Sequence, residues 1–256
     1  MSTHLTSLPQ LADRIFLADG GLETTLIFHD GLDLPDFAAF VLLADEEGRT
    51  ALRRYFESYL AIATDAGRGI VLESATWRAS QDWGVRLGYS AAALAAANRA
   101  AVDLLLELRE SHQTPQVPVV VSGCVGPRGD GYQPDSLMTP DQAEAYHAEQ
   151  IAVFADAGAD LVTAITMTHP GEASGFARAA AAAGMPSVVS FTVETDGRLP
   201  SGESLAEAVE TTDAETDSAP AYYMVNCAHP THFEEVLRAG NGSLQRIRGC
   251  VPTRRL

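Results

Sequence analysis

The sequence predicts an α/β protein built on a parallel sheet, and three observations lead to that fold class. Short runs rich in Val, Ile and Leu alternate with long runs rich in Ala and Leu along the 256 residues. The short runs are almost continuously apolar, which is typical of strands covered on both faces. Single helices between consecutive strands indicate right-handed βαβ units, in which neighbouring strands run parallel.

Each element is predicted from its own composition and from the residues at its two ends. Six segments predict strands, and a seventh is expected near Gln245–Arg248: Ile15–Asp19, Gly69–Glu73, Val117–Ser122, Leu161–Thr166, Ser187–Val193 and Tyr222–Asn226. The segments between them predict helices: Glu46–Ala66, Ser90–Ser111, Pro140–Ala157, Gly171–Ala183, Glu203–Thr211 and Thr231–Arg238. Gly67, Gly158, Gly184 and Gly240 each stand just past a helix end, and Thr139-Pro140 is a typical helix start.

Both an open doubly wound sheet and a (β/α)8 TIM barrel fit this alternation. No G-x-G-x-x-G follows the first strand, which disfavours a dinucleotide-binding sheet. Polar and glycine-rich motifs instead follow strand after strand, which is how a barrel builds its active face. The pattern supplies about six βα units plus a seventh strand, fewer than a complete barrel has. We therefore expect residues 1–256 to form a single, incomplete barrel domain that lacks the last strands.

The composition excludes several classes of function. With 17 Lys+Arg against 34 Asp+Glu, the net charge of −17 argues against nucleic acid or an anionic membrane as a partner. All 17 basic residues are Arg, which excludes Schiff-base, pyridoxal-phosphate and P-loop chemistry because each uses a lysine. Residues 1–4 do not resemble the start of a secretory signal peptide, and no run of about 18 apolar residues predicts a membrane-spanning helix. The three cysteines are widely spaced, unlike those of a secreted disulfide framework. These features predict a cytoplasmic protein.

Residues that could bind a ligand directly follow the first two predicted strands. After the first, Asp19 can accept hydrogen bonds from an amine, and Gly20 and Gly21 let the backbone approach a ligand closely. A simple turn with a capping Asp is the alternative. After the second, the ring of Trp77 could bind a substrate through a cationic methyl group. The alternative is that Trp77 and Trp83 only pack beneath the loop.

The third and sixth predicted strands also end in candidate residues. The loop Ser122–Gly131 could donate backbone N–H groups to a carboxylate. Cys124 could be a ligand or a nucleophile, or it could be inert packing. Cys227 ends the sixth strand, and a thiolate is a strong zinc ligand. His229 and His232 could be co-ligands, or they could simply order the loop and the following helix. A hydrolase that binds metal through His169, His229 and His232 is a further alternative.

Taken together, these motifs resemble the homocysteine S-methyltransferase family, which includes the betaine–homocysteine and S-methylmethionine–homocysteine methyltransferases. The resemblance runs from about residue 13 to about residue 248. It rests on six segments in the family's order: Asp19-Gly20-Gly21, Gly126-Pro127, Tyr146–Gln150, Ala157–Leu161, Ser190–Gly202 and Val225-Asn226-Cys227.

The resemblance implies a (β/α)8 barrel that carries a zinc-dependent methyltransferase. Such an enzyme moves a methyl group from an activated small-molecule donor to the thiol of homocysteine and so forms methionine. It implies that Cys227 binds zinc, that Asp19 and the two following glycines hold the amino acid end of the substrate, and that Asn226 lies beside the metal ligand. Zinc would deprotonate the acceptor thiol, which is mostly protonated at neutral pH. A homo-oligomer is compatible with this interpretation.

Two departures from the family pattern leave alternatives open. The family usually carries a Glu-Thr step near the end of its fourth strand that binds the substrate amine, where this sequence has Ile165-Thr166. Another thiol or a selenol is therefore an alternative acceptor. The remaining two zinc thiolates of the family belong to a Gly-Gly-Cys-Cys motif that is not in this sequence. The alternative function is thus a catalytically inactive, C-terminally truncated barrel.

Overall fold

The computed structural model describes residues 7–12, 14–131, 137–240 and 242–252. Residues 1–4, on which the sequence predicts no secretion signal, lie outside these ranges. The chain divides into two compact units, one made of residues 1–125 with 152–161 and the other of residues 126–151 with 162–256. The expectation of a single domain over residues 1–256 stays a prediction.

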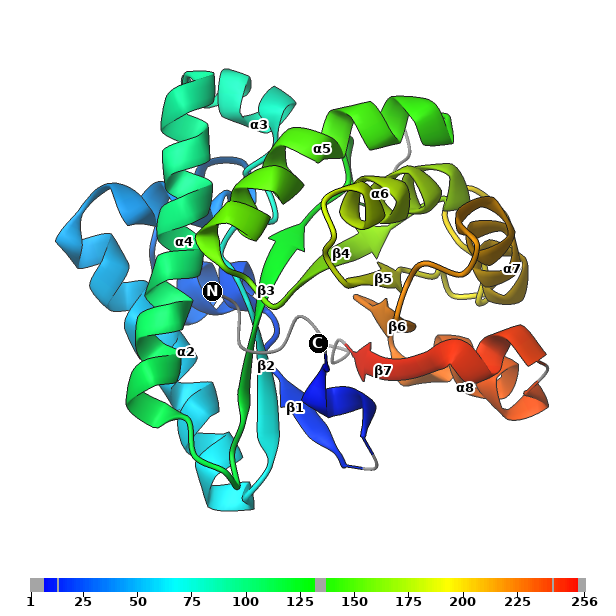
Figure 1. Cartoon of the computed structure of the whole chain (residues 1–256), viewed down its shortest axis with the longest axis horizontal. Helices are drawn as coiled ribbons and strands as arrows, with labels where there is room; N and C mark the ends of the chain where they lie inside the picture. Colours follow the sequence, from blue (N-terminus) through cyan, green and yellow to red (C-terminus); the bar gives the residue numbers. More distant parts are fainter. Residues whose placement is uncertain (1–6, 13, 132–136, 241, 253–256) are drawn as a thin grey trace. The chain divides into compact units, whose positions relative to one another are not determined.

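In the part of the chain that the structure describes, seven parallel strands follow one another along the sequence, as the alternation predicts (Figure 1). Within the first unit β1 pairs with β2 and β2 with β3, and within the second unit β4 pairs with β5, β5 with β6 and β6 with β7. Their bounds are β1 Phe16–Ala18, β2 Gly69–Glu73, β3 Val119–Val125, β4 Leu161–Met167, β5 Ser187–Phe191, β6 Tyr222–Asn226 and β7 Ile247–Val251. The prediction of six strand–helix units plus a seventh strand is confirmed.

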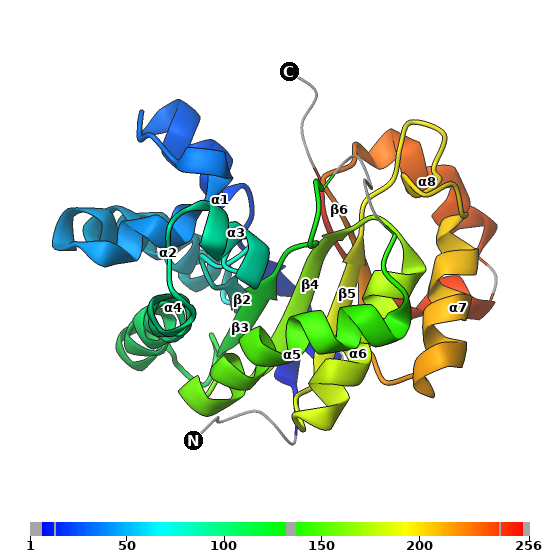
Figure 2. The same cartoon turned by 90° about the horizontal axis from the view of Figure 1, so that it is seen from above.

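Helices follow the strands at the predicted places. Their bounds are α1 Leu22–Thr24, α2 Glu46–Ala66, α3 Gln81–Arg86, α4 Ala91–His112, α5 Pro140–Ala157, α6 Pro170–Ala182, α7 Leu205–Thr216 and α8 Pro230–Ala239. In the first unit α2 and α4 lie side by side, and in the second unit α6 lies beside α7 (Figures 1 and 2). Among the residues with described positions, none of these helices has the length and apolarity needed to span a bilayer.

The helix ends confirm the capping and terminating residues that the sequence predicts. Gly67 and Gly240 adopt left-handed conformations just past α2 and α8. Thr139 accepts a hydrogen bond on its side chain from the N–H of Gln142, and the Gln142 side chain accepts from the N–H of Thr139. This reciprocal pair caps the start of α5. The short helices α1 and α3 were not predicted, because a segment of three to six residues shows too little periodicity.

The third strand is longer than predicted, and hydrogen bonds from side chains explain why. It continues past Ser122 to Val125, so Cys124 lies in a buried strand rather than in the loop. The N–H of Cys124 donates to the Ser74 hydroxyl at 2.9 Å, and the Thr76 hydroxyl donates to the Cys124 carbonyl at 2.7 Å. Side chains that follow β2 therefore continue the pairing past its last residue. The pKa of the Cys124 thiol is raised by this burial, which favours inert packing over ligand chemistry.

Other predicted bounds differ by one to five residues, at one end or at both. β5 stops at Phe191 instead of Val193, and α7 continues five residues past the predicted Thr211 to Thr216. The acidic segment in α7 continues as helix because a capping box at Ser204 and Glu207 starts it, and because Asp217 ends it in a left-handed conformation.

A buried ion pair holds the core of the first unit. Arg109 of α4 donates to Asp160 Oδ2 at 2.7 Å, and the N–H of Val121 in β3 donates to the same oxygen at 2.9 Å. Both charged side chains are almost fully enclosed, with 10% of Arg109 and 0% of Asp160 exposed. Gly123 leaves room beside β3 for the ring of Phe154, since a Cβ at Gly123 would lie 2.4 Å from that ring.

Candidate functional site

Asp19, directly after β1, is bound on both carboxylate oxygens by its own unit. Oδ1 accepts the N–H of Glu73 at 2.8 Å, and Oδ2 lies 3.3 Å from the Tyr55 hydroxyl of α2. The side chain is only 4% exposed, and this burial raises its pKa to about 7 although both hydrogen bonds lower it. Asp19 therefore exchanges its proton near neutral pH, as expected of a group at a functional site.

The glycines after Asp19 form a tightly held turn. The Gly20 carbonyl accepts from the hydroxyls of Tyr55 at 2.9 Å and Tyr59 at 2.7 Å. Gly21 has a φ of +69°, a conformation that favours glycine. We call Asp19, Gly20, Tyr55, Tyr59 and Glu73 the Asp19 cluster. Sequence reasoning missed the two tyrosines, although their spacing of four on one predicted helix places them on the same face.

The ring of Trp77, expected to bind a cationic methyl group, already lies against a cation from the same unit. The guanidinium of Arg78 lies 4.0 Å from the ring centroid of Trp77 and 3.9 Å from that of Trp83. Arg78 also faces half-buried Glu23, whose pKa is raised by burial to about 7 while the Arg78 charge lowers it. The cation–π attraction is thus realised inside the protein, and contact of Trp77 with a substrate stays a prediction.

In the second unit, Asn226 clamps an irregular point in β4. Pairing with β5 shifts register between Ala164 and Met167, which makes a β-bulge that contains Thr166. The N–H of Thr166 donates to Asn226 Oδ1 at 3.0 Å, and the Ser190 hydroxyl donates to the same oxygen at 2.7 Å. Asn226 Nδ2 donates to Thr166 Oγ1 at 2.8 Å. Asn226 therefore satisfies the backbone N–H that the bulge removes from the ladder.

The clamp holds Thr166 in a strained backbone conformation. Its φ of +67° is rare for a β-branched residue. Because a backbone N–H can only donate, its bond to Asn226 fixes which amide atom is oxygen. Thr166 Oγ1 then accepts from Asn226, which leaves its single proton for Cys227 Sγ at 3.9 Å. Thr166, Ser190, Asn226 and Cys227 form what we call the Asn226 cluster.

Replacing Asn226 by Ala is expected to lower the free energy of unfolding by roughly 1–3 kcal/mol, because buried donors lose their acceptor. Urea unfolding followed by circular dichroism measures the loss. In a Thr166→Gly background Asn226 Nδ2 has already lost its acceptor Thr166 Oγ1, and glycine adopts the left-handed conformation without strain, so the same substitution should cost less. An equal loss in both backgrounds would contradict a clamping role for Asn226.

The described residues do not fit the expected zinc site. Cys227, the expected ligand, is half-buried just after β6 with a φ of +52°. Within the described ranges, no three His, Cys, Asp or Glu side chains gather into a group that could hold a metal ion. Zinc in proteins takes three or four such ligands, so we assign no step of the chemistry to a metal.

The hydrolase alternative is wrong for the part of the chain that the structure describes. His169 caps α6, where Nδ1 accepts from the N–H of Glu172 at 3.3 Å and Nε2 lies 3.5 Å from Glu172 Oε2. Nδ1 is therefore occupied by its own helix, and Nε2 faces the Glu172 carboxylate of that helix without a hydrogen bond of normal geometry. His229 caps α8 by accepting from the N–H of Thr231 at 3.4 Å, and its ring lies 5.9 Å from that of His232. This confirms that His229 orders the loop.

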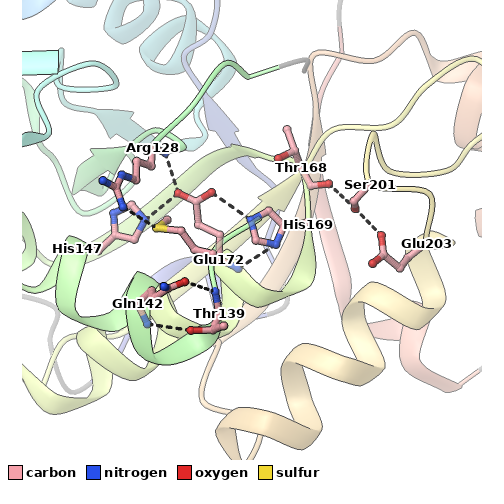
Figure 3. Close-up of polar contacts among 10 residues, drawn as sticks. Arg128, Thr139, Gln142, His147, Thr168, His169, Glu172, Ser201 and Glu203 are labelled. Carbon is pink, nitrogen blue, oxygen red and sulfur yellow. Dashed lines mark hydrogen bonds and ion pairs between the residues drawn. The ribbon is translucent and has the colours of Figure 1, made fainter. Parts of the chain in front are cut away.

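Figure 3 shows a buried carboxylate that sequence reasoning missed. Oε1 of Glu172 accepts from the N–H of Arg128 at 2.7 Å and lies 3.0 Å from His147 Nε2. Burial opposes the charge of Glu172, but hydrogen bonds from His147 and His169 outweigh it and lower its pKa to about 2. One N–H of the loop after β3 thus donates to a carboxylate of the protein itself, that of Glu172, and binding of a ligand carboxylate by this loop stays a prediction. The only sequence signal was an acid and a histidine within Ala-rich helices.

Comparison with known proteins gives concordant results. A model of the family described as homocysteine S-methyltransferase matches residues 16–253. The selenocysteine Se-methyltransferase of Brassica oleracea var. italica is 25% identical over 241 residues, which cover 85% of this chain and 66% of that enzyme. The chain thus spans just under two thirds of that relative's length.

Two solved structures of the homocysteine methyltransferase MmuM from Escherichia coli are similar in fold. The oxidized form gives a TM-score of 0.75 at 21% identity and covers 96% of this chain and 94% of that one. The metallated form gives 0.73 at 22% identity, with coverage of 94% and 93%. This likeness confirms the predicted TIM-barrel-like α/β fold.

Proposed function

We propose that this chain, which belongs to the homocysteine S-methyltransferase family, transfers a methyl group from an activated donor to the thiol of homocysteine and so forms methionine. The observation that carries the proposal is the family match over residues 16–253. In the reaction a sulfur–carbon bond forms to the methyl group, and the donor's bond to that methyl breaks. The donor keeps the electron pair of the broken bond, and the thiol proton leaves to solvent.

In this proposal Asp19 receives the ammonium group of the acceptor. An ionised carboxylate has about four lone-pair positions, and Asp19 uses two of them in the hydrogen bonds to Glu73 and Tyr55. Since the pKa of Asp19 is raised to about 7, the ionised form dominates only above neutral pH. Acceptor binding should therefore strengthen as the pH rises through about 7.

The acceptor could instead be a selenol amino acid. The relative from Brassica carries the name selenocysteine Se-methyltransferase. Half-buried Ile165 stands where the resemblance expects a Glu, and an aliphatic side chain cannot pair with an ammonium group. Because Ile165 replaces the family's usual partner for the substrate ammonium group, both homocysteine and a selenol amino acid are to be tested as acceptors. The cysteines Cys124, Cys227 and Cys250 are free, and we propose the cytoplasm as the compartment that keeps such thiols reduced.

Methyl transfer by the purified chain tests the proposal. Homocysteine and selenocysteine serve as acceptors, S-methylmethionine and betaine as donors, and mass spectrometry detects the methylated product. We expect Asp19→Asn to raise KM for the acceptor at pH 8 by at least tenfold, because an amide carries no charge for the ammonium. Asp141→Asn, at an acid whose side chain is 92% exposed, should leave KM unchanged. A folded chain that methylates neither acceptor would favour the inactive alternative.

Zinc is tested separately, by elemental analysis of the purified chain beside Cys227→Ser. About one zinc per chain, lost in the variant, would support the assignment of Cys227 that the family resemblance implies. A wild-type chain without zinc would contradict that assignment.

A further inference from the structure

The hydroxyl of Tyr55 lies between two polar groups that directly follow β1, the Asp19 carboxyl group and the Gly20 carbonyl. It is 2.9 Å from the Gly20 carbonyl and 3.3 Å from Asp19 Oδ2. Tyr59, one turn further along α2, donates to the Gly20 carbonyl at 2.7 Å and also contacts the Tyr55 hydroxyl, but no hydrogen bond joins it to the Asp19 carboxyl group. The two phenols thus share one acceptor, and Tyr55 alone also reaches the carboxyl group.

The number of protons on these groups determines which hydrogen bonds can form in each protonation state of Asp19. A phenol has one proton to donate and can also accept. When Asp19 is ionised, Tyr55 can donate to Oδ2 while Tyr59 alone satisfies the Gly20 carbonyl. When Asp19 is protonated, its own O–H can donate to the Tyr55 oxygen, and the Tyr55 proton can turn to Gly20. Both protonation states of Asp19 therefore keep a hydrogen-bond partner in the same place.

We propose that Tyr55 is a positioning residue for the acceptor amino acid, since it holds the Asp19 carboxyl group in place whether or not that group carries its proton. Tyr59 supports only the Gly20 half of the turn. The inference rests on the proposed function, in which Asp19 receives the acceptor's ammonium. Neither tyrosine belongs to any motif on which the family resemblance stands.

The groups that face Asp19 determine how removing Tyr55 must act. Burial and, to a smaller extent, the negative charge of Glu23 raise the pKa of Asp19, which lies at about 7 when all its neighbours are included. The N–H of Glu73, the hydroxyl of Tyr55 and the N–H of Asp19 itself lower it. Loss of the Tyr55 hydroxyl removes a stabilising contact to the charged form and raises the pKa. Loss of the Tyr59 hydroxyl removes no contact to the carboxyl group.

The test compares Tyr55→Phe with Tyr59→Phe, because each deletes one oxygen and keeps the ring. Homocysteine binding is measured by calorimetry as a function of pH. We expect the wild type to gain affinity with a midpoint near pH 7, as the pKa of Asp19 requires. In Tyr55→Phe the midpoint should rise by about 0.5–1 pH unit and the affinity should recover at higher pH. In Tyr59→Phe the midpoint should not move.

A second readout needs no substrate. Carbon NMR of protein labelled at the aspartate carboxyl groups follows Asp19 directly, with Asp19→Asn used to assign its signal. If the wild type binds homocysteine but both variants share its midpoint, the role of Tyr55 is refuted and the proposed function stands. If the wild type binds no acceptor at any pH, the proposed function fails and the acceptor-positioning role of Tyr55 fails with it. An unchanged Asp19 titration in Tyr55→Phe refutes the contact itself.

Discussion

Asp160→Asn is expected to lower the free energy of unfolding by about 3–5 kcal/mol, a large part of the stability of an ordinary domain. The substitution leaves the Arg109 guanidinium buried without its counter-charge, where it now lies 2.7 Å from Asp160 Oδ2. It also weakens the acceptor for the N–H of Val121. Urea unfolding of wild type and variant measures the difference.

An exposed ion pair provides the control for this prediction. Arg178 and Asp141 lie 3.0 Å apart, but the Asp141 side chain is 92% exposed. Asp141→Asn should change stability by less than about 1 kcal/mol, because water screens the pair and solvates what remains. A loss for Asp160→Asn as small as that for Asp141→Asn would show that the Arg109 charge finds another partner.

Glu172→Gln is expected to remove a pH dependence of stability as well as stability itself. The pKa of Glu172 is about 2 in the folded chain against an ordinary value of 4.5. The ionised carboxylate therefore stabilises the folded state above about pH 4.5, and this contribution is lost as the pH falls towards 2. The difference of pKa corresponds to about 3 kcal/mol. Gln also turns an N–H group towards His169 Nε2, which lies 3.5 Å from the Glu172 carboxylate in the wild type.

Thermal unfolding between about pH 2 and pH 9 measures this contribution and separates it from that of Asp19. The folded pKa of Asp19 is raised from 3.8 to about 7, so its contribution has the opposite direction. It is fully present below about pH 4 and is lost as the pH rises through about 7. Glu172→Gln should flatten the acid side of the curve, and Asp19→Asn the neutral side. An acid side that stays as steep in Glu172→Gln would contradict the lowered pKa.

The sequence predicted the elements well where hydrophobic runs are long and well punctuated. The bounds of α2 and α5 agree with the prediction, because Asp45 and Thr139 cap their starts and glycines follow their ends. The prediction failed where side chains decide a boundary. β3 continues to Val125 because Ser74 and Thr76, fifty and forty-eight positions away from Cys124, extend its pairing. A window of neighbouring residues contains no such information.

In the candidate site, too, some features could be predicted from the sequence and others could not. The sequence indicated Asp19, Gly20, Gly21 and Cys227, because polar and glycine residues after apolar strands mark the active face of parallel α/β folds, and the family resemblance added Asn226. Their contacts with ligands stay predictions. What the sequence did not indicate is the support behind them. The contact of Tyr55 with Asp19 and the clamp of Asn226 on Thr166 join residues 36 and 60 positions apart.

The sequence by itself determined the succession of strands and helices, the family, and the residues that stand at the strand ends. These properties follow from local periodicity and from short motifs, which are written along the chain. The tertiary structure alone decided the electrostatic state of the groups. Burial raises the pKa of Asp19 while partners from other elements lower that of Glu172. The physical reason is that the charge state of a carboxyl group depends on its distances to water, donors and other charges, and only the folded chain fixes those distances.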